Sequence, residues 1–492
     1  MARRRINVSP DAVEEGHVVP VDGLEAAFDA VRAEMKVPAD FPEDVLEEAR
    51  AAVAAPRLPD RDETDLPMLT IDPPGSMDLD QAMHIARDGS GFLVRYAIAD
   101  LPAFLAPDGP MDKEAWQRGQ TVYLPDGRAP LHPPTVSEGG ASLLPGRERP
   151  AYLWDLRLDA QGRTTEVQVH RAMVRSVDRF DYEQVQQRLD EGTADERLEL
   201  LREVGERRIA LERERGGAGL PMPEQEVTLD ERGRYRIGFR PLVPVEEWNA
   251  QISLLTGMAA AAMMLRGGVG ILRTMPEADR EAVARFRRQA GALGVPWPAE
   301  TSYGDFLRAL DRTNPRHLAL IHDATMLFRG AGYTPFDGAV PEQTEQAAVA
   351  APYAHVTAPL RRLVDRFGLA VCEALSSGAD VPDWVRTALP ALPEVMERSD
   401  QLAGSVDRAC LNVVEAAALR TNVGQTFPAA VVELRGDDES LVQVEDPAIL
   451  APCAGRAELG EEVRVRLVEA DMERRVVRFE LADPAPGADP VS

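Results

Sequence analysis

The sequence predicts an α+β protein in about three domains, and three observations lead to this fold class. The 492 residues suit about three domains of ordinary size. In the middle of the chain strand-like segments come first and helical segments follow, an order that favours an α+β fold over a doubly wound sheet. Residues 424–481 then alternate apolar and polar side chains between turns, which is typical of a small antiparallel β-barrel of five strands.

Residues 1–62 are expected to form a separate helical module. Apolar residues recur at helical spacing over residues 23–35, and residues 42–55 open with Pro42 and acidic side chains, as helices often begin. Two short helices joined by a turn suit either a helix-turn-helix or a helical packing module. The segment has 8 basic and 14 acidic residues, which disfavours binding to a nucleic acid duplex. A packing module is therefore the preferred interpretation.

The rest of the chain divides at changes of pattern. A linker rich in Pro and Asp leads into residues 63–422, which are expected to form the main domain, a mixed sheet surrounded by helices. Residues 423–483 are expected to form the small β-barrel, of the OB type, and residues 484–492 a disordered tail.

Composition limits the compartment and the partners. The net charge of −27 predicts repulsion from anionic membranes and from nucleic acid. The chain starts without an apolar leader, and its longest apolar run, residues 252–265, is too short to span a bilayer, so we expect a buried helix there and no membrane partner. Three widely spaced cysteines indicate a reducing compartment, which predicts a cytoplasmic protein without a zinc site.

The stretch "TIDPPGSMDLDQA" gathers carboxylates around a turn. On an extended segment Asp78 and Asp80 would share a face, and the Pro-Pro-Gly-Ser turn would fold Asp72 back beside them. Crowded carboxylates repel one another unless a cation neutralises them, and Mg²⁺ prefers such oxygen ligands together with water and substrate phosphate. The alternative is that acidic residues are abundant in this chain and that Asp favours turns.

The stretch "AHVTAPLRRLVDRFG" places Arg361 and Arg362 before an apolar helix. Guanidinium groups added to the backbone donors of a helix N-terminus make a good anion site. An ordinary surface arginine pair is the alternative. Carboxylates for a metal and arginines for a phosphate together favour cleavage of a phosphodiester.

These two stretches resemble the signatures of the ribonuclease II family, the RNB-domain exoribonucleases. The intervening segment with "TVYLPDGRAPLHPPTVSEGG" is similar as well, the resemblance covers about residues 66–420, and the C-terminal barrel resembles the S1 domain that follows in this family. The resemblance implies an RNB catalytic domain and a hydrolytic 3′–5′ exoribonuclease that releases nucleoside 5′-monophosphates. The implied substrate is single-stranded RNA or RNA with a 3′ overhang, the implied cofactor is Mg²⁺ with Mn²⁺ as a possible substitute, and a monomer is expected.

The resemblance also implies the roles of single residues. Asp72 and Asp80 would bind Mg²⁺, Asp78 would contact the 3′-terminal ribose, and Arg361 would contact the scissile phosphate. Tyr123 would stack on the terminal base and Tyr182 would line the RNA path. Arg361 and Arg362 would both bind RNA.

Several positions depart from the family pattern. Gln81 stands where most members have a fourth aspartate; its amide oxygen is expected to bind the metal more weakly, so that Gln81→Asp would lower the Mg²⁺ requirement. Gln251, Ile252 and Leu411 lie near positions where glutamates are expected. No cold-shock barrel is recognisable in residues 1–62, and residues 424–483 have 7 arginines against 14 acidic residues, a poor composition for gripping RNA.

Two other functions remain open. One is a non-catalytic RNA-binding or regulatory protein on a degenerate RNB scaffold, as Gln81 suggests. The other is a Mg²⁺-dependent phosphodiesterase of very short oligonucleotides, as the acidic outer domains suggest.

Overall fold

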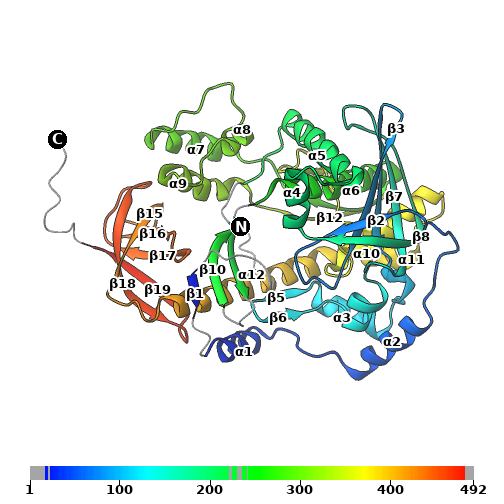
Figure 1. The fold of residues 1–492 in the computed structure, drawn as a ribbon, viewed down its shortest axis with the longest axis horizontal. Helices are drawn as coiled ribbons and strands as arrows, with labels where there is room; N and C mark the ends of the chain where they lie inside the picture. Colours follow the sequence, from blue (N-terminus) through cyan, green and yellow to red (C-terminus); the bar gives the residue numbers. More distant parts are fainter. Residues whose placement is uncertain (1–16, 20–22, 221–223, 230–234, 241, 483–492) are drawn as a thin grey trace.

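The computed structural model describes residues 17–19, 23–220, 224–229, 235–240 and 242–482. Two closed five-stranded barrels lie at opposite ends of the molecule, with helices around and between them (Figure 1). The fold class expected from the sequence, α+β with a C-terminal barrel, is confirmed. The predicted tail, residues 484–492, lies outside the described residues.

The strand-like segments of the middle region close into what we call the main barrel. Its strand order is β2-β3-β4-β7-β8, and it closes because β2 pairs in parallel with β8. Its largest fully buried side chains include Trp154, Tyr96 and Phe92, which lie in the cluster that the strands share with the surrounding helices. The sequence predicts a mixed sheet here, and the parallel closing pair is what turns that sheet into a barrel. The strands are β2 (Met68–Ile71), β3 (Gln81–Asp88), β4 (Gly91–Ala99), β7 (Glu148–Leu158) and β8 (Thr164–Phe180).

Helices cover the main barrel and share its core. Helix α5 packs on β3, α10 packs on β8, and α6 packs on both of these helices. Helix α6 contains the longest apolar run of the sequence and is buried along most of its length, as predicted. Among the described residues, no helix is long and apolar enough to cross a membrane. The helices of this region are α3 (Pro110–Arg118), α4 (Tyr182–Asp190), α5 (Glu196–Arg215), α6 (Pro244–Gly267), α10 (Leu363–Ser377) and α11 (Asp383–Ala388).

Short helical turns and strand pairs complete this region. The turns are η1 (Leu101–Ala103), η2 (Thr135–Gly140) and η4 (Leu389–Ala391). The antiparallel pairs are β5 (Val122–Leu124) with β6 (Gly127–Ala129), β11 (Val269–Thr274) with β12 (Gly332–Asp337), and β13 (Glu345–Gln346) with β14 (Ala351–Pro352).

The N-terminal helices pack on the main domain, each at a different place. The apolar face of α1 (Leu24–Met35) lies in one cluster with the β5–β6 hairpin and α12 (Leu392–Leu419), whereas α2 (Glu43–Ala54) packs on α3 and η2. Strand β1 (His17–Val19) pairs with β10 (Tyr235–Arg240), which pairs with β9 (Glu224–Leu229). These contacts differ from the separate module expected from the sequence. They agree with packing and not with a free helix-turn-helix.

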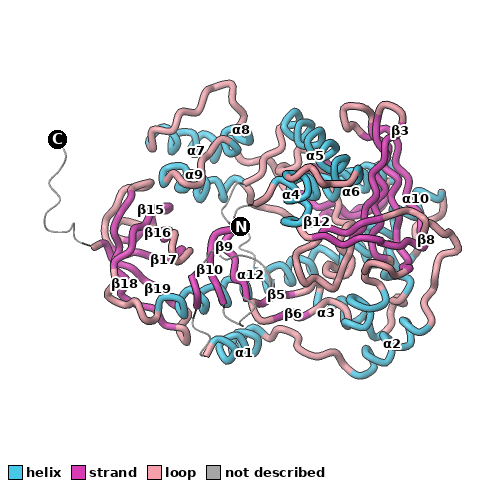
Figure 2. The backbone as a smooth tube through the Cα atoms, in the orientation of Figure 1, coloured by secondary structure: helices cyan, strands magenta, loops and turns pink. Residues whose placement is uncertain are grey.

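The C-terminal barrel is held between two helices (Figures 1 and 2). The end of α12 packs on β18 and β19, and α9 packs on the outer face of β15, where Leu318 meets Ala430 and Val432. The barrel order is β15-β16-β17-β19-β18. Its strands are β15 (Thr426–Leu434), β16 (Glu439–Val444), β17 (Ile449–Ala454), β18 (Glu462–Asp471) and β19 (Val476–Leu481). The helical group beside it contains α7 (Arg280–Ala292), α8 (Tyr303–Arg308), α9 (Pro315–Asp323) and η3 (Ala324–Leu327).

Candidate active site

The loop between β2 and β3, residues 72–80, is called the acidic loop. It leaves β2 at Asp72, whose N–H donates to the carbonyl of Phe180 at 3.1 Å, and it turns at Pro73–Ser76 with a Ser76-to-Pro73 hydrogen bond of 3.2 Å. Gly75, the third residue of this turn, has φ 78°, which a type II turn requires at that position. The predicted turn is present, but Asp78 and Asp80 lie on a loop and not on an extended strand, because β3 begins only at Gln81.

A second loop, residues 354–362, is called the arginine loop, and Asp80 joins it to the acidic loop. The N–H of Leu360 donates to Oδ1 of Asp80 at 2.7 Å, and Nε of Arg361 lies 3.3 Å from Oδ2 of Asp80. Asp80 is only 4% exposed. One buried carboxylate therefore receives both a backbone donor and a guanidinium from the arginine loop.

The two arginines have different surroundings. Arg361 keeps 48% of its side chain exposed, whereas Arg362 binds both oxygens of the buried Asp365, through Nε at 2.5 Å and Nη2 at 2.8 Å. Asp365 also accepts from the N–H of Ala358 at 2.7 Å. Arg361 is thus available to an anion, and Arg362 supports the loop from behind. Helix α10 begins at Leu363, so that Arg361 precedes the helix and does not lie in its first turn.

Burial perturbs the carboxylates that face Arg361. It raises the pKa of Asp72 to about 7, and Arg361 and Arg179 oppose the rise. It also raises the pKa of Asp80 well above its usual range, with Arg361 again opposing. Burial acts to lower the pKa of Arg361, but the Tyr123 phenol, Asp80 and Asp72 outweigh it and the pKa is raised. These residues therefore form one electrostatic unit, in which a nearby cation would favour the charged carboxylates.

The donor set fits a cation held by few protein ligands. The Oδ2 atom of Asp72 is buried without a hydrogen-bond partner among the described residues. The described part of the chain contains no group of three His, Cys, Asp or Glu side chains arranged to hold a metal ion. Mg²⁺ commonly takes only one or two carboxylates and completes its shell with water and substrate phosphate. Asp72 and Asp80 meet that requirement.

Gln81 uses both ends of its amide within the protein. Its Nε2 donates to the carbonyl of Thr357 at 2.6 Å, and its Oε1 accepts from the hydroxyl of Tyr96 at 2.6 Å. The Tyr96 hydroxyl also lies 2.9 Å from Oγ of Ser253. The sequence suggests Gln81 as a metal ligand. In this structure Gln81 instead joins β3 to the arginine loop.

Asp78 is paired with an arginine that sequence reasoning missed. Nη1 of Arg128, on β6, donates to Oδ1 of Asp78 at 2.5 Å, and Nη2 donates to Oε1 of Glu138 at 2.7 Å. Arg128 stands directly opposite Tyr123 in the β5–β6 hairpin. Tyr123 is 37% exposed, so its ring is available for stacking. The stretch around Arg128 gives no sequence signal for this pairing, because its partner Asp78 lies 50 positions away.

The other residues singled out from the sequence have the following surroundings. Tyr182 begins α4, is partly buried and packs against the main hydrophobic cluster. Gln251 donates to Glu212 at 2.6 Å, and Ile252 and Leu411 are buried in apolar clusters. Burial raises the pKa of Tyr96, and Asp72 and Tyr182 both add to the rise, so Tyr182 lies near the candidate site.

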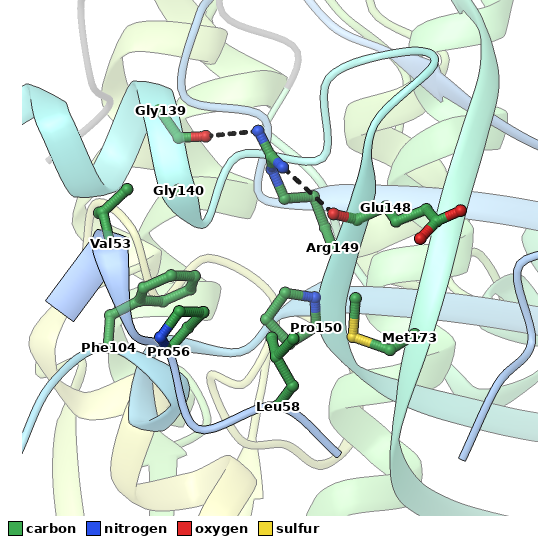
Figure 3. Close-up of a pocket in the computed structure, with 10 residues that line it drawn as sticks. All are labelled: Val53, Pro56, Leu58, Phe104, Gly139, Gly140, Glu148, Arg149, Pro150 and Met173. Atoms are coloured by element: carbon green, nitrogen blue, oxygen red, sulfur yellow. Dashed lines mark hydrogen bonds between the residues drawn. The ribbon is translucent and has the colours of Figure 1, made fainter. Parts of the chain in front are cut away.

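A surface cavity of about 280 Å³ lies elsewhere (Figure 3). Val53, Phe104 and Met173 line it with apolar atoms, and Arg149 borders it while donating to the carbonyl of Gly139 at 2.8 Å. No candidate site residue lines it.

Comparison with known proteins gives matches along most of the chain. The family model described as RNB domain matches residues 60–369, and that of the RNase II-type exonuclease C-terminal S1 domain matches residues 425–482. Ribonuclease R 1 of Lactococcus lactis subsp. lactis (strain IL1403) is 23% identical over 503 residues, covering 92% of this chain. Ribonuclease R of Escherichia coli (strain K12) is 28% identical over 346 residues, covering 66% of this chain. The chain spans 60% and 41% of the lengths of these two relatives.

Solved structures share the fold. RNase R of Mycoplasma genitalium, in complex with ribose-methylated single-stranded RNA, has a TM-score of 0.83 at 17% identity, covering 94% of this chain and 78% of that chain. Yeast Ssd1, described as a pseudonuclease, has a TM-score of 0.67 at 14% identity, covering 90% of this chain and 58% of that chain. The fold therefore occurs both in ribonucleases and in a relative described as inactive.

Proposed function

The chain belongs to the RNB-domain family, and from this premise we propose that it is a Mg²⁺-dependent hydrolytic 3′–5′ exoribonuclease. The proposal is that water attacks the last phosphodiester of an RNA chain. The bond from phosphorus to the 3′ oxygen of the preceding nucleotide then breaks, that oxygen leaves as a hydroxyl, and a nucleoside 5′-monophosphate is released.

The observation that carries the proposal is the contact of exposed Arg361 with buried Asp80. The guanidinium of Arg361 is held 3.3 Å from Asp80 Oδ2 with 48% of its side chain exposed. A phosphate bound there would meet a fixed positive charge beside two carboxylates suited to a divalent cation. Preorganised charge of this kind stabilises the charge that develops in phosphoryl transfer.

Each residue of the candidate site has a proposed role. Asp72 and Asp80 would hold Mg²⁺, or Mn²⁺ in its place, since both ions accept carboxylate and water ligands. The chemistry supplied by the bound ion is activation of water and neutralisation of phosphate charge. Arg361 would bind the scissile phosphate, Tyr123 would stack on the terminal base, and Asp78 would accept from the terminal ribose. Tyr182 and Arg362 are proposed to support the RNA path from the packed positions described above.

The proposed substrate is single-stranded RNA or RNA with a 3′ overhang. RNase R of Mycoplasma genitalium has been solved with single-stranded and with double-stranded RNA, which supports RNA as the ligand class. We place the protein in the cytoplasm because its three cysteines are free and buried, and we expect a monomer.

A second function is favoured by one observation, the closed hydrogen bonding of Gln81. Because both ends of its amide are hydrogen-bonded within the protein, Gln81 does not replace the fourth aspartate as a metal ligand, which would suit a non-catalytic RNA-binding protein on this scaffold. Yeast Ssd1, described as a pseudonuclease, shares the fold.

The experiment is incubation of the purified chain with an RNA that has a 3′ overhang, with Mg²⁺ and with EDTA. A 5′-labelled sample shows the shortened RNA, and a uniformly labelled sample shows the released nucleotides. We expect a ladder that shortens from the 3′ end and mononucleotide products only with Mg²⁺. RNA binding without cleavage would favour the scaffold, and cleavage confined to dinucleotides would favour a phosphodiesterase of very short oligonucleotides.

A further inference from the structure

The β5–β6 hairpin has two faces with different surroundings. Val122 and Leu124 are 2% and 1% exposed and pack in one cluster with Leu24, Phe28 and Val31 of α1. Side chains alternate along a strand, so Tyr123 projects from the opposite face. Arg128 is its directly opposed partner and shares that face. One face of the hairpin is therefore anchored in the N-terminal helix, and the other presents Tyr123 and Arg128 to the acidic loop.

Three ion pairs fix the hairpin in addition to this apolar contact. At its turn, Asp126 accepts from Arg32 of α1, and the two side chains are 18% and 26% exposed. At β6, Arg128 bridges Asp78 and Glu138, with side-chain exposures of 24%, 11% and 29% in that order. Pairs this shielded from water are screened less than surface pairs, and a bridging guanidinium fixes direction as well as distance.

We propose that Arg128 is a positioning residue and that α1 is a structural part of a clamp for the terminal nucleotide of RNA. Arg128 holds the Asp78 carboxylate beside the Tyr123 ring, and Arg32 holds the hairpin that carries both Tyr123 and Arg128. Helix α1 thereby affects the binding of the terminal nucleotide, although it contacts the hairpin at its opposite face and its turn. This inference rests on the proposed function, because it takes RNA as the ligand of Tyr123 and Asp78.

The clamp predicts a selective effect on short substrates. A short oligoribonucleotide depends on the terminal contacts, whereas a long one has further contacts along its chain. Loosening the hairpin should therefore raise the KM for a pentanucleotide RNA on the order of tenfold, with a much smaller change in kcat or in the KM for long RNA.

The test uses the full chain with Arg128→Ala, Arg128→Lys and Arg32→Asp, and the exchange Arg32→Asp with Asp126→Arg. Binding of a fluorescent pentanucleotide is measured in EDTA, and KM and kcat are measured with Mg²⁺. We expect Arg128→Ala to weaken pentanucleotide binding on the order of tenfold, Arg128→Lys to recover part of it, and the charge exchange to recover most of what Arg32→Asp loses.

The matched control is Arg157→Ala. Arg157, on β7, also contacts two carboxylates, Asp88 and Glu166, but Asp88 stands at the end of β3 remote from the acidic loop. If it weakens pentanucleotide binding as much as Arg128→Ala does, or if Arg128→Ala leaves that binding unchanged, the clamp is refuted. Because binding is read in EDTA, a wild type that binds but does not cut refutes the exonuclease alone. A wild type that does not bind the pentanucleotide refutes the clamp.

Discussion

Gln81 and Thr357, 276 positions apart, are joined by a 2.6 Å hydrogen bond from the Gln81 amide to the Thr357 carbonyl. The other end of the amide accepts from Tyr96 at 2.6 Å. Asp80 accepts from the N–H of Leu360, so the last residue of the acidic loop and the first residue of β3 both hold the arginine loop. Gln81 is thereby oriented by its neighbours, and a carboxylate in its place would lose the donor to Thr357.

For this reason we expect Gln81→Glu and Gln81→Asp to impair the protein. A glutamate keeps the length of the side chain but faces a carbonyl oxygen with a second acceptor, and an aspartate is also too short. Both should lower kcat about tenfold without reducing the Mg²⁺ concentration for half-maximal rate. The measurement is a Mg²⁺ titration on one single-stranded RNA. The control is Tyr96→Phe, which keeps the donor from Gln81 to Thr357 and removes the hydroxyl that contacts both Gln81 and Ser253. A severalfold lower Mg²⁺ requirement in Gln81→Asp would instead support the expectation from the sequence that Gln81 is a weak metal ligand.

Replacing the buried Asp80 should separate hydrolysis from binding. In Asp80→Asn the side-chain oxygen still accepts from the Leu360 N–H, so the arginine loop stays in place while the charge is lost. We expect kcat to fall on the order of 10²–10³-fold and RNA affinity in EDTA to change little. Single-turnover cleavage and fluorescence anisotropy check both parts. Substantial turnover by Asp80→Asn would show that Asp80 is not a metal ligand.

The buried His132 should make stability depend on pH. It is 1% exposed, and burial lowers its pKa to about 3, with Arg366 adding to the effect. The unfolded chain takes up a proton near pH 6.5 and the folded chain does not, so this contribution is complete above pH 6.5 and is lost as the pH falls below it. From pH 7 to pH 5 the loss is about 2 kcal/mol in the free energy of unfolding.

Urea denaturation of the wild type and of His132→Gln at pH 5 and pH 7 measures this contribution. Glutamine does not titrate, so the variant should lose less stability than the wild type between the two pH values. Because every other titrating group is common to both proteins, an equal loss would show that His132 is not responsible.

The local sequence pattern predicted most strands of the main barrel, but not that these strands close into a barrel. The segments expected as strands appear as β2, β4, β7 and β8 with small shifts at their ends, whereas β3 was not expected. The alternation in residues 424–481 appears as a closed barrel. Alternation reports which side chains are buried and is silent about the partner strand, so the parallel pairing of β2 with β8 was not predictable. The apolar stripe of α1 likewise showed which face is buried but not that α12 and the hairpin cover it.

The candidate site shows the same limit. Asp72, Asp80 and Arg361 were identified from their own stretches, and the structure places all three in one electrostatic unit. The partners that orient them were not identified. Arg128 resembles any other arginine in a sequence with 55 basic residues, and the acceptor on Thr357 is a backbone carbonyl, which no side-chain pattern reveals. Long-range partners depend on the tertiary fold.

Arg361 and Arg362 are adjacent in sequence, but their different surroundings predict that replacing Arg361 reduces kcat and that replacing Arg362 reduces stability. Arg361 is 48% exposed beside Asp80, so Arg361→Ala should fold normally and lose on the order of 10²–10³-fold in kcat. Arg362 pairs with the fully buried Asp365, so Arg362→Ala leaves a buried carboxylate without its cation. Its main loss should be in the free energy of unfolding, about 3–5 kcal/mol.

Urea denaturation and single-turnover cleavage of both variants distinguish these outcomes. The matched variant is the double substitution Arg362→Ala with Asp365→Asn, which removes the stranded charge and should recover part of the lost stability. If Arg361→Ala were the unstable protein and Arg362→Ala the stable but inactive one, the phosphate contact would have to move to Arg362. Arg361 would then be the residue that supports the loop.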